Sequence, residues 1–124
     1  MNHVLVVDDD HAIVNTVESV LTDEGYAVST AADGRQALEE VDRELPTLVL
    51  LDMRMPVMDG WGFADEVKKR GIELPIVVMT AAQDARRWAS EIGASGYVAK
   101  PFDIDALLQA VAEHRQPHKE EGRS

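Results

Sequence analysis

The chain has no cysteine among its 124 residues. The absence of cysteine excludes a disulfide framework and a thiolate metal site. The sequence also has no apolar run that approaches the ~20 residues needed to span a bilayer. Its N-terminus lacks a basic stretch followed by an apolar one, so we expect no secretory signal. We therefore expect a cytoplasmic protein with no membrane insertion.

Basic residues are scarce: 12 Lys and Arg stand against 23 Asp and Glu, which gives a formal net charge of −11. Non-specific nucleic-acid binding rests on phosphate neutralisation by basic side chains, so this balance argues against a nucleic-acid partner. It suits a protein that recruits cations or meets basic patches on a partner protein. A chain of this length buries roughly two-thirds of its unfolded surface, so we expect one domain.

Five short apolar runs alternate with five segments of helical periodicity. The spacing predicts strands at residues 4–7, 27–31, 48–51, 76–79 and 97–99. The helices that follow them are expected to turn apolar residues inward, among them Val17, Leu38, Leu45, Phe63, Ile104 and Leu107. Strict alternation predicts an α/β fold, with a doubly wound parallel sheet covered by helices on both faces.

Polar residues stand directly at the ends of four of these strands. Asp8 and Asp9 follow the first strand, Asp52 the third, Thr80 the fourth and Lys100 the fifth. The functional crevice of such a sheet lies outside the carboxyl ends of its strands, so these side chains are expected at one edge. Two carboxylates ~5 Å apart at an effective dielectric of ~20 repel each other by about 3 kcal/mol. A bound cation, a basic side chain or a shared proton must offset that repulsion.

The residue types at this edge indicate phosphoryl chemistry. Clustered carboxylates without histidine or cysteine make a hard oxygen site suited to Mg²⁺. A carboxylate can also attack phosphorus and form an aspartyl phosphate, which requires in-line positioning and charge neutralisation. Asp52 stands alone at its strand end and is the predicted nucleophile, while Asp8 and Asp9 are better placed to hold a metal. Lys100 and Thr80 supply an ammonium and a hydroxyl.

In this order, the motifs resemble the receiver domain of two-component response regulators. The resemblance rests on Asp8-Asp9, Asp52, Met55-Pro56-Val57-Met58-Asp59-Gly60, Thr80-Ala81, Gly93-Ala94-Ser95-Gly96-Tyr97 and Lys100-Pro101. It covers residues 1–115 and leaves 116–124 as a polar C-terminal tail. It implies a flavodoxin-like sheet with strand order 2-1-3-4-5 and five surrounding helices. It also implies a stand-alone, single-domain response regulator, a phosphorylation-controlled binding module rather than a substrate-converting enzyme.

The resemblance implies a role for each site residue. Asp52 would accept a phosphoryl group from a phosphohistidine of a sensor histidine kinase or histidine phosphotransfer protein. The implied ligands of Mg²⁺ are Asp9, Asp52 and the backbone carbonyl of Arg54, with Asp8 acting largely through water. Lys100 would pair with the phosphoryl group, and Thr80 and the backbone amide of Ala81 would hydrogen-bond it. Tyr97 would turn inward when Thr80 moves toward the phosphate, which switches a surface for a downstream protein target.

Other functions fit parts of the pattern. A receiver domain can serve as a phosphorelay intermediate or a phosphate sink instead of a switch. A haloacid-dehalogenase-like phosphatase also begins with an aspartate pair such as Asp8-x-Asp10, but Ala12 stands where that motif has Thr or Val. A flavodoxin-like electron carrier needs a phosphate loop after the first strand, where three aspartates would repel the flavin phosphate. A receiver-like binding module that does not respond to phosphorylation is disfavoured because every site residue is present.

Several residues have simpler interpretations of their own. Asp10 is expected to cap the first helix rather than bind a metal. Trp88 is expected to pack in the core rather than contact a partner, and the peptide bond of Lys100-Pro101 favours an extended or cis junction. His114 and His118 have metal-binding spacing, but a frayed tail is the favoured interpretation.

The residues at two positions beside the predicted site leave the lifetime of its acyl phosphate open. Arg54 stands two residues after the phosphoacceptor, and Ala82 stands two residues after Thr80. In the family these positions flank the acyl phosphate and tune its lifetime, in a direction that the sequence leaves open.

Overall fold

The computed structural model describes residues 2–115, in which strands and helices alternate strictly along the chain. The strands are β1 (His3–Val7), β2 (Ala27–Ala31), β3 (Leu48–Asp52), β4 (Ile76–Ala81) and β5 (Gly96–Lys100). The helices are α1 (His11–Asp23), α2 (Gly34–Arg43), α3 (Gly60–Lys69), α4 (Ala82–Ile92) and α5 (Ile104–His114). The expected tail, 116–124, and His118 lie outside the described residues. None of the helices within 2–115 is long and apolar enough to cross a membrane.

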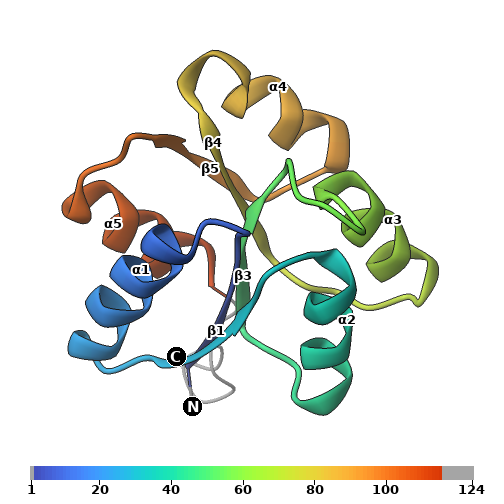
Figure 1. The fold of residues 1–124 in the computed structure, drawn as a ribbon, viewed down its shortest axis with the longest axis horizontal. Helices are drawn as coiled ribbons and strands as arrows, with labels where there is room; N and C mark the ends of the chain where they lie inside the picture. The colour runs from blue at the N-terminus through green and yellow to red at the C-terminus, as the bar shows by residue number, and fades with distance from the viewer. Residues whose placement is uncertain (1, 116–124) are drawn as a thin grey trace, which may run out of the picture.

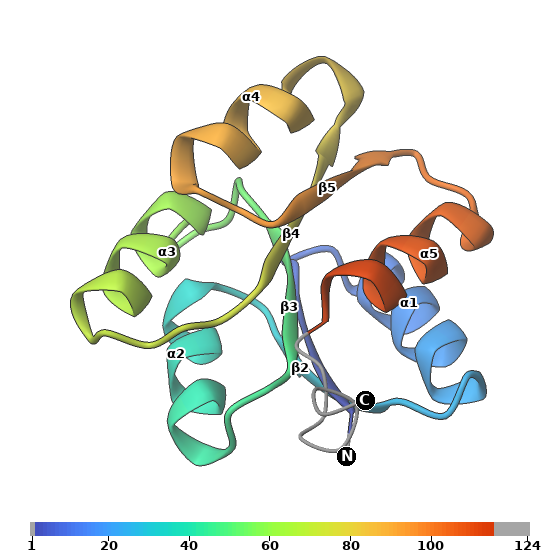
Figure 2. The same ribbon diagram turned by 180° about the vertical axis from the view of Figure 1, so that it is seen from behind.

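All neighbouring strands pair in parallel, in the order β2-β1-β3-β4-β5. Helices α1 and α5 cover one face of the sheet, to the left in Figure 1, and α2, α3 and α4 cover the other face. The view from behind in Figure 2 shows the same two layers. The doubly wound α/β fold and the strand order are therefore confirmed. The strand order reverses between β1 and β3, where sheets of this kind open a crevice.

Two hydrophobic clusters, one on each face, fill the space between sheet and helices. Successive strand residues point to opposite faces, so a strand buried on both sides has a continuous apolar run. Val7, Leu51 and Val78 pack with α2, α3 and α4, whereas Val6 and Leu50 pack with α1 and α5. The apolar runs seen in the sequence are thus explained by burial on both faces.

Two residues that periodicity placed inward are exposed. Leu45 is 53% exposed because α2 ends at Arg43 and the backbone at Glu44 is already extended. Proline restricts the residue before it to extended conformations, so Pro46 keeps Leu45 out of the helix. Ile104 is 52% exposed because it is the first residue of α5, whose apolar face is buried only from Leu107 onward. The inward orientation expected for these two side chains was wrong.

Candidate functional site

The strand register brings the predicted polar residues to one edge of the sheet. In the pairing of β1 with β3, Val7 lies opposite Leu51, so Asp8 and Asp52 follow at neighbouring strand ends. Lys100 ends β5, two strands away from β3 on the same edge. Side chains alternate along a strand, so Asp8, Asp52 and Lys100 share the face that α1 and α5 cover. The site is therefore built by topology rather than by sequence proximity.

Three carboxylates converge at this edge. Asp8, Asp9 and Asp52 each offer one oxygen, and these three oxygens lie within 4.8 Å of one another. Asp8 and Asp52 are buried, whereas Asp9 is exposed to solvent. Carboxylate oxygens at this separation, with water access on one side, suit a hard cation such as Mg²⁺, which keeps several waters. The residues present thus fit the cation that the sequence predicted.

The ammonium of Lys100 lies among these carboxylates. Its Nζ donates to Oδ2 of Asp8 at 2.7 Å and lies 3.7 Å from Oδ1 of Asp52. The other oxygen of Asp8, Oδ1, accepts the backbone N–H of Asp10 at 2.9 Å. Of the three ways to offset the carboxylate repulsion, a basic side chain is therefore already in place. The Lys100-Pro101 peptide bond is cis, one of the two junctions expected.

The surroundings of Asp52 alter its ionisation. Burial, together with the neighbouring charges of Asp8 and Asp9, raises the pKa of its carboxyl to about 6. The Lys100 ammonium and a hydrogen bond from the backbone N–H of Arg54 act in the opposite direction and limit that rise. The carboxyl is therefore mostly ionised at neutral pH, as a nucleophile must be.

Thr80 and Tyr97 share the opposite face of the sheet, on the side of α4. In the register of β4 with β5, Thr80 lies opposite Ala99 and Val78 opposite Tyr97, so both side chains point the same way. Thr80 is buried, whereas Tyr97 is 47% exposed. Ala81 follows at the end of β4 and is the N-terminal capping residue of α4. The switch implied for Thr80 and Tyr97 stays a prediction.

Aspartates cap four of the helices in the described part of the chain. The side chain of Asp10 accepts the backbone N–H groups of Ala12 and Ile13, which confirms its expected role as the cap of α1. Asp33, Asp59 and Asp103 cap α2, α3 and α5 in the same way. Helix α4, which begins at the site, has no side-chain cap. Its first N–H groups are consequently not occupied by a capping carboxylate.

The loop between β3 and α3 forms the rim beside Asp52. The backbone N–H of Gly60 donates to the carbonyl of Met53 at 2.9 Å, and a Cβ at Gly60 would lie 2.8 Å from Met53 Cα. Within the loop, the N–H of Met58 donates to the carbonyl of Pro56 at 2.7 Å, and Val57 between them has φ +68°. A β-branched residue at positive φ is strained. The backbone of this loop is thus tightly folded beside Asp52, and Val57 lies at its exposed tip.

Trp88 is buried among apolar residues between α4 and the sheet, which confirms its expected packing. Sequence reasoning missed its polar neighbour: the guanidinium carbon of Arg54 lies 5.3 Å from the centroid of the Trp88 ring. The ring of Trp61 meets Trp88 edge-on, with centroids 5.0 Å apart. No helical or strand spacing relates a loop residue to a tryptophan in a later helix, so no sequence signal could have revealed this contact.

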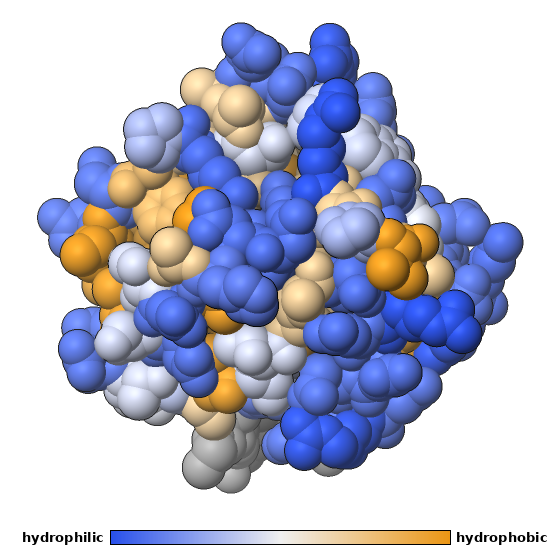
Figure 3. Space-filling view, in the orientation of Figure 1, coloured by the Kyte–Doolittle hydropathy of each residue, from blue (hydrophilic) through white to orange (hydrophobic). Residues whose placement is uncertain are grey.

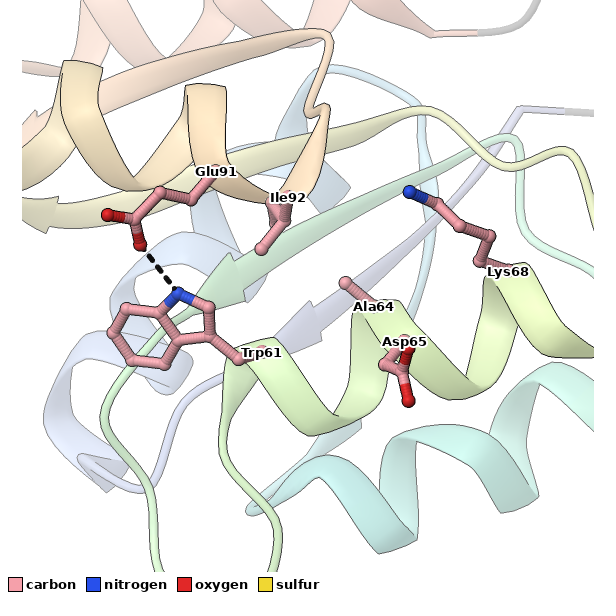
Figure 4. A pocket seen from close by; sticks show the side chains of 6 residues that line it. All are labelled: Trp61, Ala64, Asp65, Lys68, Glu91 and Ile92. Carbon is pink, nitrogen blue, oxygen red and sulfur yellow. Dashed lines mark hydrogen bonds between the residues drawn. The ribbon is translucent and has the colours of Figure 1, made fainter.

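A cavity of about 240 Å³ lies between α3 and α4. Figure 4 shows its lining side chains, which are Trp61, Ala64, Asp65, Lys68, Glu91 and Ile92. None of them belongs to the carboxylate cluster. The surface in Figure 3 is mostly hydrophilic, with apolar side chains in small separate groups, one of them over α1 and α5. The converging charges at the strand ends therefore define the candidate site.

Comparisons with known proteins agree with this geometry. The family model of the response regulator receiver domain matches residues 4–112. The chain is 40% identical over 113 residues to sporulation initiation phosphotransferase F of Bacillus subtilis, a match that covers 90% of this chain and 91% of that protein. It superimposes on chemotaxis protein CheY4 of Vibrio cholerae with a TM-score of 0.83 and 34% identity, covering 92% of this chain and 98% of that one.

A second group of relatives is longer. The chain is 45% identical over 113 residues to a probable transcriptional regulator, ycf27, of Cyanophora paradoxa, a match that covers 87% of this chain and 47% of that protein. The chain thus spans about half the length of the first curated relatives it matches.

Proposed function

Because the chain belongs to the response regulator receiver domain family, we propose that Asp52 accepts a phosphoryl group from a phosphohistidine. The donor would be a sensor histidine kinase or a histidine phosphotransfer protein. The observation that carries this proposal is the cluster of Asp8, Asp9 and Asp52, with oxygens within 4.8 Å of one another and the Lys100 ammonium beside them. Proteins of this family are generally phosphoacceptors rather than classical enzymes.

In the transfer step, a carboxylate oxygen of Asp52 attacks the phosphorus of the phosphohistidine. The new O–P bond forms as the N–P bond breaks, and the electron pair of that bond stays on the imidazole nitrogen. The Asp52 pKa of about 6 leaves the carboxyl ionised for this attack at neutral pH. Lys100, whose Nζ is 3.7 Å from Asp52, offsets the charge that gathers on the phosphoryl oxygens.

Asp9, Asp52 and the backbone carbonyl of Arg54 would hold Mg²⁺ at this site. When bound, Mg²⁺ neutralises charge on the transferred group. Both oxygens of Asp8 are already hydrogen-bonded, one to Lys100 and the other to the N–H of Asp10. This supports a role for Asp8 through a metal-bound water rather than by direct ligation. Asp9 is exposed and leaves room for further waters.

Thr80 and the backbone amide of Ala81 would hydrogen-bond the phosphoryl oxygens. Thr80 is buried at the end of β4, and α4 begins directly after Ala81 without a side-chain cap. Uncapped N–H groups at a helix N-terminus favour an anion. These features support Thr80 as the residue that senses the phosphate.

The output of phosphorylation would be a changed protein-binding surface. Thr80 and Tyr97 lie on the same face of neighbouring strands, and Tyr97 is half exposed, so it has room to turn inward when Thr80 moves. The surface formed by α4, β5 and α5 would then bind a downstream protein. This is a two-state element biased by one local charge change.

Phosphotransfer profiling in Mg²⁺ against the histidine kinases and phosphotransfer proteins of the source genome tests the proposal. We expect one donor to label the wild-type protein rapidly, and Asp52→Asn to abolish the label. Reduction of the acyl phosphate with borohydride, followed by mass spectrometry, should place the modified residue at Asp52. If every donor labels wild type and Asp52→Asn equally, the proposal fails.

A second candidate function is phosphorelay. It is favoured by the name of the Bacillus subtilis relative, which describes a phosphotransferase. The labelled protein would be mixed with histidine phosphotransfer proteins. Passage of the label from Asp52 to a histidine would support a relay, whereas simple hydrolysis would support a switch or a phosphate sink.

A further inference from the structure

Arg54 touches two parts of the molecule. Its backbone N–H donates to the Asp52 carboxylate, while its guanidinium carbon lies 5.3 Å from the centroid of the Trp88 ring on α4. A cation within ~6 Å of an aromatic face is attracted by the ring quadrupole. Arg54 is exposed and Trp88 is buried, so the movable partner of this contact is the arginine. One residue thus joins the phosphoacceptor to α4.

The Trp88 ring is a rigid platform. Trp61 packs against it edge-on at 69°, and the indole N–H of Trp61 donates to Oε1 of Glu91 at 2.9 Å (Figure 4). Helix α3 is thereby tied to α4 at the point where Trp88 sits. The contact with Trp61 therefore helps to fix the position of the buried Trp88 ring.

A second guanidinium on the same ring gives an internal comparison. Arg87 lies 5.9 Å from the Trp88 centroid, but its Nη2 also donates to Asp84 at 2.8 Å. Both of these residues belong to α4, so the Arg87 contact stays within one helix. Of these two guanidinium contacts, the one made by Arg54 connects the ring with the loop that follows Asp52.

We propose that Trp88 is a positioning residue for Arg54: it holds the guanidinium on α4 and competes for it with the phosphoryl group on Asp52. This inference rests on the proposed function of Asp52. A charge-assisted, bidentate hydrogen bond to a phosphoryl dianion is stronger than an exposed cation–π contact. Phosphorylation therefore draws the guanidinium from Trp88 and frees α4 from the loop. This link to α4 is separate from the Thr80 and Tyr97 pair.

Binding of beryllofluoride in Mg²⁺, measured by titration calorimetry, tests the competition without hydrolysis. Beryllofluoride mimics the phosphoryl group on an aspartate. We expect Trp88→Leu to raise its affinity two- to fivefold, the equivalent of about 0.5–1 kcal/mol, because Arg54 is released. Arg54→Ala should lower the affinity for beryllofluoride. Adding Trp88→Leu to the Arg54→Ala variant should not change that affinity further. Arg87→Ala is the matched control and should bind like wild type.

The inference is overturned if Trp88→Leu changes the affinity for beryllofluoride in the Arg54→Ala background. It is also overturned if Trp88→Leu leaves that affinity unchanged in the wild-type background. Equal binding by wild type and Asp52→Asn would instead overturn the proposed function, so the two failures are distinguishable. If Trp88→Leu does not fold, wild-type NMR decides the question. The Arg54 side-chain protons should show an upfield ring-current shift that beryllofluoride removes. A shift that survives saturation with beryllofluoride contradicts the competition.

Discussion

The Nζ of Lys100 lies 2.7 Å from Oδ2 of Asp8, although the two residues are 92 positions apart in the sequence. Strands β1 and β5, which carry them, are separated in the sheet by β3 and β4. The lysine therefore reaches across the strand end that bears Asp52 and lies between two buried carboxylates. Its charge offsets a repulsion that would otherwise oppose folding of the whole edge.

We expect Lys100→Met to destabilise the protein by about 1–3 kcal/mol in metal-free buffer, because two buried carboxylates lose their cation. Urea unfolding followed by circular dichroism measures this loss. Excess Mg²⁺ should recover part of it, since the ion supplies positive charge to the same oxygens. Lys69→Met, which removes an exposed i,i+4 pair with Asp65, is the control and should cost less than about 0.5 kcal/mol. Equal losses in the two variants would contradict the prediction.

The raised pKa of Asp52 makes stability depend on pH. Its folded-state pKa is about 6 against an ordinary value of 3.8, so the folded protein holds this proton more tightly than the unfolded chain. The contribution of Asp52 to stability is therefore greatest below about pH 4 and is lost as the pH rises toward about 6. Above that range, the ionised carboxylate costs about 1–3 kcal/mol.

Asp52→Asn removes that cost. In metal-free buffer we expect the variant to be more stable than wild type at pH 7, and the difference to shrink as the pH falls to 4. Chemical unfolding at several pH values measures this difference in the free energy of unfolding. Asp65→Asn, an exposed acid on α3, serves as the control and should show no comparable change with pH. A difference that is constant over this range would show that burial of the charge is not its cause.

Much of the site could be predicted because its residues follow apolar strands directly. Once the alternation of strands and helices indicated a parallel sheet, Asp8, Asp52 and Lys100 had to meet at one edge. The same logic placed Asp10 as a cap, since capping depends on the residues next to it in sequence. These predictions succeeded because local spacing and sheet topology are sufficient to make them.

Features that depend on side-chain packing could not be predicted in this way. Periodicity shows which residues could share a helix face, but not where the helix stops, so Leu45 and Ile104 were placed inward wrongly. The stacking of Arg54 on Trp88 joins a loop to a helix with no repeating spacing between them. Contacts of this kind depend on how helices lie on the sheet, which the sequence does not state.

Mg²⁺ should stabilise the folded protein through Asp9. We expect saturating Mg²⁺ to raise the free energy of unfolding, by about 2.7 kcal/mol at one hundred times its dissociation constant. Asp9→Asn should remove most of that gain, because it takes an exposed carboxylate from the cluster. Asp10→Ser, which preserves a cap at α1, should keep the full response. Thermal unfolding with and without Mg²⁺ checks both variants, and a full response in Asp9→Asn would exclude it as a ligand.

The two glycines in the first turn of α3 should differ sharply in their tolerance of alanine. A Cβ at Gly60 would lie 2.8 Å from Met53 Cα and 3.1 Å from the carbonyl oxygen of Asp52, so the backbone after the phosphoacceptor would have to shift. We expect Gly60→Ala to cost about 1–3 kcal/mol and to slow phosphorylation of Asp52.

At Gly62, by contrast, the nearest atom to an added Cβ is Cγ of Met58, at 3.0 Å on a flexible side chain. Alanine also gains about 0.5–1 kcal/mol over glycine inside a helix. Gly62→Ala should therefore change the free energy of unfolding by less than about 1 kcal/mol in either direction. Urea unfolding and phosphorylation rates of the two variants, measured side by side, decide the matter. Similar behaviour in both would mean that the contact of Gly60 with Met53 does not hold the end of β3 in place.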